Sequence, residues 1–344
     1  MKRWFIFLLI ASMVLGGPLL LESCQKPGQT APSILPFPIP PGFPPVVFDF
    51  QNNPVTEEGF LLGRKLFYDG RLSKNGIHSC GSCHQPVAAF TTFEHDRSHG
   101  YNDSHTLRNA PGLFNLAWYP YFNQDGSEKK LERLFEKHIM HPGEMADHLA
   151  YISKEIDSDP GYRQKFRAAF GDDHVNGARI LYALQQFVIS LVSANSKYDK
   201  VKRGESSFTA EEGQGYALFM NHCASCHKEP LFTDFSFRNT GVEVDPGLRD
   251  YGRMRVTGLA ADSLKFRVPG LRNLEFTSYY LHDGRVSLPR HVIQHYRFGI
   301  NQGPTLDPLL INGISLTNTE ENQLVAFLRT LSDSSFLNNP RFKE

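Results

Sequence analysis

The sequence is short of cysteines, of net charge and of strand-forming segments, and each shortage excludes a class of protein. Its 36 lysines and arginines balance 36 acidic residues, and no basic run stands out, so we expect no nucleic-acid partner. Of the five cysteines, one ends the N-terminal apolar segment and four form two pairs, which leaves none for a disulfide framework. With 344 residues and weak strand signals throughout, the chain is expected to be mainly helical, with long loops and room for two domains.

The N-terminus has the pattern of an export signal. Lys2 and Arg3 precede an apolar run that ends just before Cys24. A cysteine in that place resembles the lipidated first residue of a bacterial lipoprotein, and an uncleaved membrane anchor is the alternative. In either case residues 1–23 predict a periplasmic or cell-envelope protein held at a membrane, with Cys24 as the candidate lipidation site.

Proline marks the segment that follows. Eight prolines lie between positions 26 and 49, a density that excludes helix and sheet interiors and predicts an extended spacer over residues 24–52. Helical periodicity begins near Asn53, and a polar stretch over residues 197–207 separates two halves. We therefore predict an N-terminal domain over residues 53–205 and a C-terminal domain over residues 206–344.

One motif occurs twice, as CGSCH over residues 80–84 and CASCH over residues 223–227. Cysteines at i and i+3 of a helical turn project from one face, so both thiols can add to the vinyl groups of one porphyrin edge. The adjacent histidine can then bind the iron. A zinc site needs four ligands at shorter spacings, and a redox dithiol does not need the histidine. The duplication predicts two covalent haem c groups, attached through Cys80, Cys83, Cys223 and Cys226, with His84 and His227 as axial ligands.

Longer stretches around these motifs resemble the bacterial di-haem cytochrome c peroxidases and their relative MauG. The resemblance covers roughly residues 53–332 and is carried by residues 63–91, 108–118, 125–145, 222–234, 255–258, 266–273 and 280–296. It implies two cytochrome c-like helical domains with one haem each, the N-terminal haem being peroxidatic and the C-terminal haem transferring electrons. It also implies hydrogen peroxide as substrate and a small c-type cytochrome or cupredoxin as electron donor.

The position opposite His227 departs from the peroxidases, in which a methionine fills it. No methionine lies between His282 and Gly303. The resemblance places Tyr296 there, as in MauG, whereas His295 and His291 are the alternative ligands. A phenolate ligand would lower the reduction potential of the haem relative to methionine.

The pocket opposite His84 departs further. The catalytic glutamate of the family corresponds to Glu144, which would shuttle protons, but the distal glutamine and proline correspond to Leu134 and His138. His138 can hydrogen-bond peroxide or bind the iron. In peroxidases a loop histidine is a labile ligand of this haem, and of His95, His99 and His105 it is His99 that lies nearest the expected place.

Two other family features are altered or only partly matched. The tryptophan between the haems corresponds to Gln124, and Trp118 is not the aligned residue. Members also carry calcium between the domains, and Asn109 and Thr257 match ligand positions, so a calcium ion is a further expectation.

Three functions therefore compete. The first is an exported, lipid-anchored di-haem peroxidase in which Glu144 and His138 are catalytic. The second is a MauG-like oxidase acting on a protein or organic substrate, which Tyr296 favours. The third is a non-catalytic electron carrier, which Leu134, His138 and Gln124 favour.

Overall fold

The computed structural model describes residues 32–344, which form one compact unit. The predicted export signal and the lipidation site Cys24 lie outside the described residues. In the part that the structure describes, no helix is both long and apolar enough to span a membrane.

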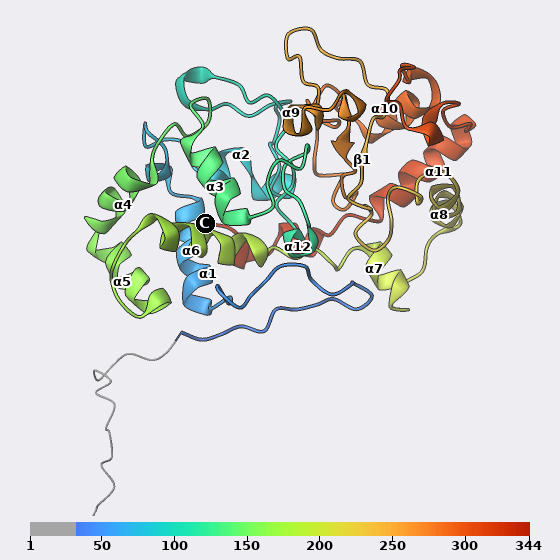
Figure 1. Cartoon of the computed structure of the whole chain (residues 1–344). Helices are drawn as coiled ribbons and strands as arrows, with labels where there is room; N and C mark the ends of the chain where they lie inside the picture. The colour runs from blue at the N-terminus through green and yellow to red at the C-terminus, as the bar shows by residue number, and fades with distance from the viewer. Residues whose placement is uncertain (1–31) are drawn as a thin grey trace, which may run out of the picture. The chain divides into compact units, whose positions relative to one another are not determined.

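Helices and long loops make up the chain (Figure 1), so the expected mainly helical fold with little strand is confirmed. The only named sheet of residues 32–344 is the antiparallel pair of β1 (Phe237–Arg238) and β2 (Phe266–Arg267). A π-helix, His295–Gly299, directly continues α10. The α-helices are α1 (Glu57–Phe67), α2 (Cys80–Cys83), α3 (Leu131–Met140), α4 (Leu149–Asp157), α5 (Pro160–Phe170), α6 (Gly177–Ile189), α7 (Lys197–Lys202), α8 (Ala210–His222), α9 (Met254–Thr257), α10 (Pro289–Gln294), α11 (Asn318–Arg329) and α12 (Ser334–Leu337).

Local sequence signals explain where several helices begin. The Thr56 side chain accepts a hydrogen bond from the Gly59 amide and caps α1. Thr209 with Glu212, and Thr317 with Glu320, form capping boxes that start α8 and α11. These three threonines therefore fix where α1, α8 and α11 begin.

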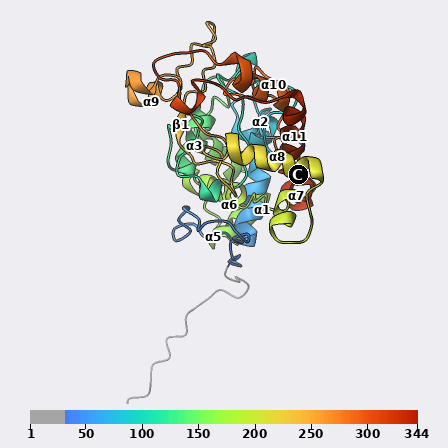
Figure 2. The same cartoon turned by 90° about the vertical axis from the view of Figure 1, so that its right-hand side faces the viewer.

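The duplicated sequence corresponds to a duplicated helix crossing. In the first half α1 packs on α6, and in the second half α8 packs on α11; both views place α8 beside α11 (Figure 2). A Cβ at Gly63 would lie 1.9 Å from the Ala183 carbonyl oxygen, and one at Gly215 would lie 1.9 Å from that of Gln323. Each glycine therefore lets two helix backbones come into contact, which explains why it recurs before each motif.

Two clusters of buried apolar side chains form the core. The first runs from Val55 to Leu191, and the second includes Tyr198, Phe219, Phe232 and Phe327. After α11 the chain returns to the first cluster, where Phe336, Leu337 and Phe342 are buried. The C-terminal end of the range 206–344 therefore packs with the N-terminal half, while the predicted boundary near residue 205 stays a prediction.

Residues 32–50 of the proline-rich segment form no helix, but the segment turns at Pro40–Phe43, where the Phe43 amide donates to the Pro40 carbonyl at 3.0 Å, and it is not a free spacer there. Its Phe37 and Phe43 rings pack on Trp118, and the Trp118 indole N–H donates to the Pro44 carbonyl at 2.7 Å. In Figure 1 the segment, in blue, runs beneath the body. The aromatic residues between the prolines supply apolar surface that is more stable buried than exposed, and this holds the segment against the protein.

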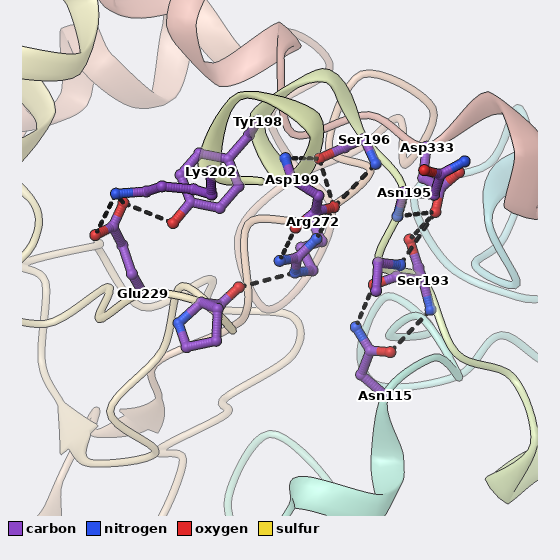
Figure 3. A network of polar contacts seen from close by, with 12 residues as sticks. Asn115, Ser193, Asn195, Ser196, Tyr198, Asp199, Lys202, Glu229, Arg272 and Asp333 are labelled. Carbon is purple, nitrogen blue, oxygen red and sulfur yellow. Dashed lines mark hydrogen bonds and ion pairs between the residues drawn. The ribbon is translucent and has the colours of Figure 1, made fainter. Parts of the chain in front are cut away.

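A polar network surrounds the segment that joins the two core clusters (Figure 3). Asp333 accepts hydrogen bonds from the Ala194 and Asn195 amides at 3.1 and 2.9 Å. Asp199 forms two hydrogen bonds, both 2.8 Å, with the guanidinium of Arg272. These contacts link residues 193–199 to the chain around α12 and to the loop that precedes Asn273.

Candidate active site

A cavity of about 740 Å³ lies between the two halves, and residues of both duplicated motifs line it. Its walls include α3, the segment around Arg267, the π-helix and α11. The structure therefore brings the motifs, 143 residues apart in the chain (226 − 83), to one internal space. Cys80, Cys83, His84, Cys223, Cys226 and His227 all face it.

Both motif histidines are oriented by backbone carbonyls. His84 Nδ1 lies 2.9 Å from the Phe90 carbonyl oxygen, and His227 Nδ1 lies 3.0 Å from that of Phe232 and 3.1 Å from that of Pro269. A carbonyl only accepts, so Nδ1 carries the proton and Nε2 keeps its lone pair. Burial lowers the pKa of His84 to about 4 and also lowers the pKa of His227. Both imidazoles are therefore neutral, as an iron ligand must be.

The four motif cysteines lie on helical turns, and burial raises the pKa of three of them, Cys80, Cys83 and Cys223. Burial raises the pKa of Cys80 and of Cys223 to about 12. Zinc binds thiolates, and within residues 32–344 no three His, Cys, Asp or Glu side chains are grouped to hold a metal ion. In each motif the histidine amide donates to the carbonyl of the first cysteine at 2.9 Å, so the two motifs have the same local turn.

An unpaired buried cation tests whether the cavity fits haem. The Arg267 side chain is 8% exposed, makes no ion pair in the described part of the chain, and its Nη1 has no hydrogen-bond partner there. Burial lowers the pKa of this guanidinium, because the charged form is poorly solvated. A buried cation at a cavity wall needs an anionic partner, and haem carries two carboxylates. The side chains that line the cavity therefore fit haem c: the motif cysteines and histidines for attachment and ligation, and Arg267 for a carboxylate.

The pocket facing His84 holds a histidine–carboxylate pair. His138 Nδ1, on α3, lies 2.5 Å from Glu144 Oε2. Burial works to lower the pKa of His138, but the hydrogen bond and charge of Glu144 outweigh it and raise that pKa. Burial likewise works to raise the pKa of Glu144, and the hydrogen bond with His138 lowers it overall. Leu134 lines the same wall and offers no hydrogen bond.

The loop with the three histidines packs beside this pair. The Tyr101 amide donates to the Glu144 carbonyl at 2.8 Å. The His99 ring lies between those of His95 and His105, with centroid distances of 4.9 and 4.2 Å. Of these three histidines, His99 alone lines the cavity.

Three side chains compete for the position opposite His227, and they point in different directions. His295 Nε2 lies 2.8 Å from the Thr240 carbonyl oxygen, and His291 is exposed and does not line the cavity. Tyr296 lines the cavity, and burial, followed by the neighbouring Cys223 and Cys226, raises the pKa of its phenol. The Tyr296 hydroxyl forms no hydrogen bond with any residue of the described range 32–344.

The two expected calcium ligands have other partners. The Asn109 side-chain amide donates to the Asp96 carbonyl at 2.8 Å, and the Thr257 hydroxyl donates to that of Arg253 at 3.4 Å. Beside Asn109, the Arg108 guanidinium pairs with Asp125 at 2.7 Å and with Asp250 at 2.5 Å. Arginine already neutralises these carboxylates, so they add no free negative charge beside Asn109, and the calcium ion stays a prediction without support in the described structure.

From the sequence, Gln124 was noted only as the residue in place of the family tryptophan, and Tyr119 and Arg267 had no predicted role. Gln124 lines the cavity, its amide N–H donates to the Asn109 carbonyl at 3.2 Å, and its Oε1 is buried without a partner in the described structure. Tyr119 also lines it, 4.6 Å beneath the Arg267 guanidinium, whereas Trp118 does not. Arg267 lies in a stretch that carried the family resemblance, but only the fold shows that its charge is unpaired.

Comparisons with known proteins agree with this geometry. A family model described as di-haem cytochrome c peroxidase matches residues 57–207. The chain is 34% identical over 285 residues to the methylamine utilization protein MauG of Methylorubrum extorquens, covering 82% of this chain and 80% of that protein. It is 34% identical over 275 residues to the cytochrome c551 peroxidase of Nitrosomonas europaea, covering 79% of each. It also resembles the crystal structure of a MauG-like protein associated with microbial copper homeostasis, with a TM-score of 0.83, 33% identity, and coverage of 90% of this chain and 99% of that one.

Proposed function

This chain belongs to the di-haem cytochrome c peroxidase family, which includes MauG, and we propose that it reduces hydrogen peroxide at the haem site of residues 80–84. The resemblance seen in the sequence is thereby confirmed, and the chain is an oxidoreductase of a family whose members hold two haems. In the proposed reaction, one hydrogen peroxide takes up two electrons and two protons and yields two waters. The electrons enter at the site of residues 223–227 from a small c-type cytochrome or cupredoxin.

The attachment residues have a defined role in this proposal. Cys80 and Cys83 would hold the first haem as thioethers, formed when their S–H groups add across its vinyl groups, and Cys223 and Cys226 would hold the second. His84 and His227 would bind the iron through Nε2, because carbonyl groups hold Nδ1. The bound haem iron supplies the redox chemistry.

The observation that carries the proposal is the hydrogen bond between His138 and Glu144. Glu144 accepts from Nδ1–H, so His138 Nε2 is left as a base toward the cavity. His138 would take the proton from the near oxygen of peroxide and return it to the departing oxygen. Glu144 would stabilise the imidazolium formed between these steps, as a carboxylate does in a catalytic triad. This pair would replace the glutamine that the family has at Leu134.

The test is peroxide turnover by the haem-loaded protein with a reduced donor. We expect His138→Ala and Glu144→Gln each to lower kcat/KM by roughly 10²–10⁴-fold, the usual contribution of a positioned acid–base group. His174→Ala, at an exposed histidine that does not line the cavity, is the control and should leave turnover unchanged. Absorption spectra of the same variants in the ferric state distinguish a His138 that transfers protons from one that binds the iron. A change from low to high spin in His138→Ala would instead make His138 an iron ligand.

A second function, a MauG-like oxidase acting on a protein or organic substrate, is supported by Tyr296. A phenolate ligand favours oxidised iron, which suits an oxidase better than an electron entry site. We propose Tyr296 as the distal ligand of the second haem and His99 as the labile ligand of the first. If the wild-type protein has two low-spin haems that do not react with peroxide, both enzymatic proposals fail and the electron carrier stands.

We also propose that the protein is lipid-anchored in the cell envelope through Cys24. The support is the sequence of residues 1–24 alone. Expression of Cys24→Ser with its signal intact should move the protein from the membrane fraction to the soluble fraction. Retention of the variant in the membrane would contradict lipidation.

A further inference from the structure

The helical segment from Pro289 to Gly299 directs its side chains along three separate stripes. Residues spaced three or four apart in a helix share a face, so Pro289, Val292, Ile293 and Tyr296 form one stripe, which lines the cavity. His291 and His295 form a second stripe, and His295 meets the Thr240 carbonyl. Arg290, Gln294 and Arg297 form the third, which faces α11.

One buried carboxylate on α11 contacts every side chain of the third stripe. Glu321 is 2% exposed and forms an ion pair with Arg297. Its Oε1 lies 3.4 Å from Arg290 Nη1 and 3.2 Å from Gln294 Nε2. Three side chains from two successive helical turns therefore converge on a single anion.

Glu321 also meets the segment where the helix is irregular. The π-helix of residues 295–299 inserts one residue into the turn, and such insertions change which side chain faces a site. Tyr296 lies between Gln294 and Arg297, the two partners of Glu321 that flank it in sequence. Its own carbonyl accepts from the Ile314 amide at 2.9 Å. These contacts before and after Tyr296 therefore fix the rotation of this turn about the helix axis.

We propose that Glu321 is the positioning residue that turns Tyr296, rather than His295, toward the second haem site. This inference rests on the proposed role of Tyr296 as a ligand. The physical reason is charge: the Arg297 side chain is 10% exposed, so removing its carboxylate partner leaves a poorly solvated guanidinium. The guanidinium would then turn toward water. A turn of the helix by one residue, about 100°, would carry Tyr296 out of the cavity and bring a neighbouring side chain in.

The experiment compares absorption and resonance Raman spectra of the ferric, haem-loaded protein. Glu321→Gln keeps the shape of the side chain and removes its charge. We expect it to lose most of the phenolate-to-iron charge-transfer band and the phenolate vibrations, while haem content and helical circular dichroism stay at wild-type levels. Glu321→Asp keeps the charge and should retain more of the band. Glu275→Gln is the matched control. It breaks an exposed ion pair with Arg329, which lies on α11 like Glu321, and it should retain the full band.

Tyr296→Phe distinguishes the role of Tyr296 as a ligand from the role of Glu321 as a positioning residue. If Tyr296→Phe loses the band and Glu321→Gln keeps it at wild-type intensity, the positioning role is wrong and the ligand assignment stands. If Tyr296→Phe changes nothing, the ligand assignment is wrong and the positioning role falls with it. Should Glu321→Gln not fold, Arg297→Gln tests the same contact, because Glu321 then keeps Arg290 as its cation. An unchanged band in Arg297→Gln would likewise overturn the positioning role.

Discussion

Arg272 and Asp199 form a buried ion pair with two hydrogen bonds, Nη1 to Oδ2 and Nη2 to Oδ1, both 2.8 Å long. A third donor of the guanidinium, Nε–H, reaches the Pro230 carbonyl at 2.8 Å, and the Phe43 ring lies 4.9 Å away. Figure 3 shows Asp199, which lies on α7, meeting Arg272 within the larger network. One arginine thereby joins α7, the loop after the second motif and the proline-rich segment.

Breaking this pair should destabilise the protein strongly. Arg272→Met leaves a buried carboxylate without its partner, and we expect a loss of roughly 3–5 kcal/mol in the free energy of unfolding. Denaturant unfolding of the haem-loaded protein measures it. The double variant Asp199→Asn with Arg272→Met should lose less than Arg272→Met alone, because no charge remains buried. Glu205→Gln, at an exposed ion pair with Arg203, is the control and should leave the unfolding midpoint in place.

The same pair predicts how stability depends on pH. Burial works to raise the pKa of Asp199, but the hydrogen bonds and charge of Arg272 hold it below the ordinary value of 3.8. The unfolded chain therefore binds this proton more readily than the folded one. The stabilisation is complete above pH of about 4 and is lost as the pH falls through the folded-state pKa. Unfolding of wild type and Asp199→Asn between pH 7 and pH 3 tests this: the variant should show the shallower decline, and parallel curves would contradict it.

The helix crossings give a matched pair of glycine substitutions on α8. Gly215→Ala places a Cβ 1.9 Å from the Gln323 carbonyl oxygen, so the helices must separate, and we expect a destabilisation of roughly 1–3 kcal/mol or more. Gly213→Ala has open space around the new Cβ and should stabilise the protein by roughly 0.5–1 kcal/mol through helix propensity. Thermal and denaturant unfolding of both variants measure the difference. Equal effects would show that the crossing tolerates a side chain.

The unpaired Arg267 should tune a haem potential. A buried cation disfavours the additional positive charge of ferric iron, so Arg267→Gln should lower at least one of the two midpoint potentials. Spectroelectrochemical titration of the variant measures both potentials. Arg249→Gln, at an exposed arginine, should leave them unchanged. Identical potentials in Arg267→Gln and wild type would mean that this guanidinium faces no haem.

Much of the fold followed from local sequence. The capping threonines Thr209 and Thr317 begin helices because their hydroxyls meet amides three residues away. The proline-rich segment was predicted only in part. The absence of helix in it follows from proline, but its packing depends on Trp118, which lies 74 residues beyond Pro44. A local pattern carries no information on such a partner.

The candidate site divides in the same way. Each CxxCH motif is complete within five residues, so the sequence alone determined that the chain presents two cysteines and a histidine on one turn, twice. The sequence left His295 and His291 open beside Tyr296, and it could not show that Tyr296 lines the cavity while His295 meets the Thr240 carbonyl. It also could not show that Arg267 is unpaired, since a missing partner is visible only when every neighbour is in place. Tertiary structure alone decided which side chains line the cavity and which charge lacks a partner, because burial, charge pairing and the direction of a side chain are set by contacts between distant segments.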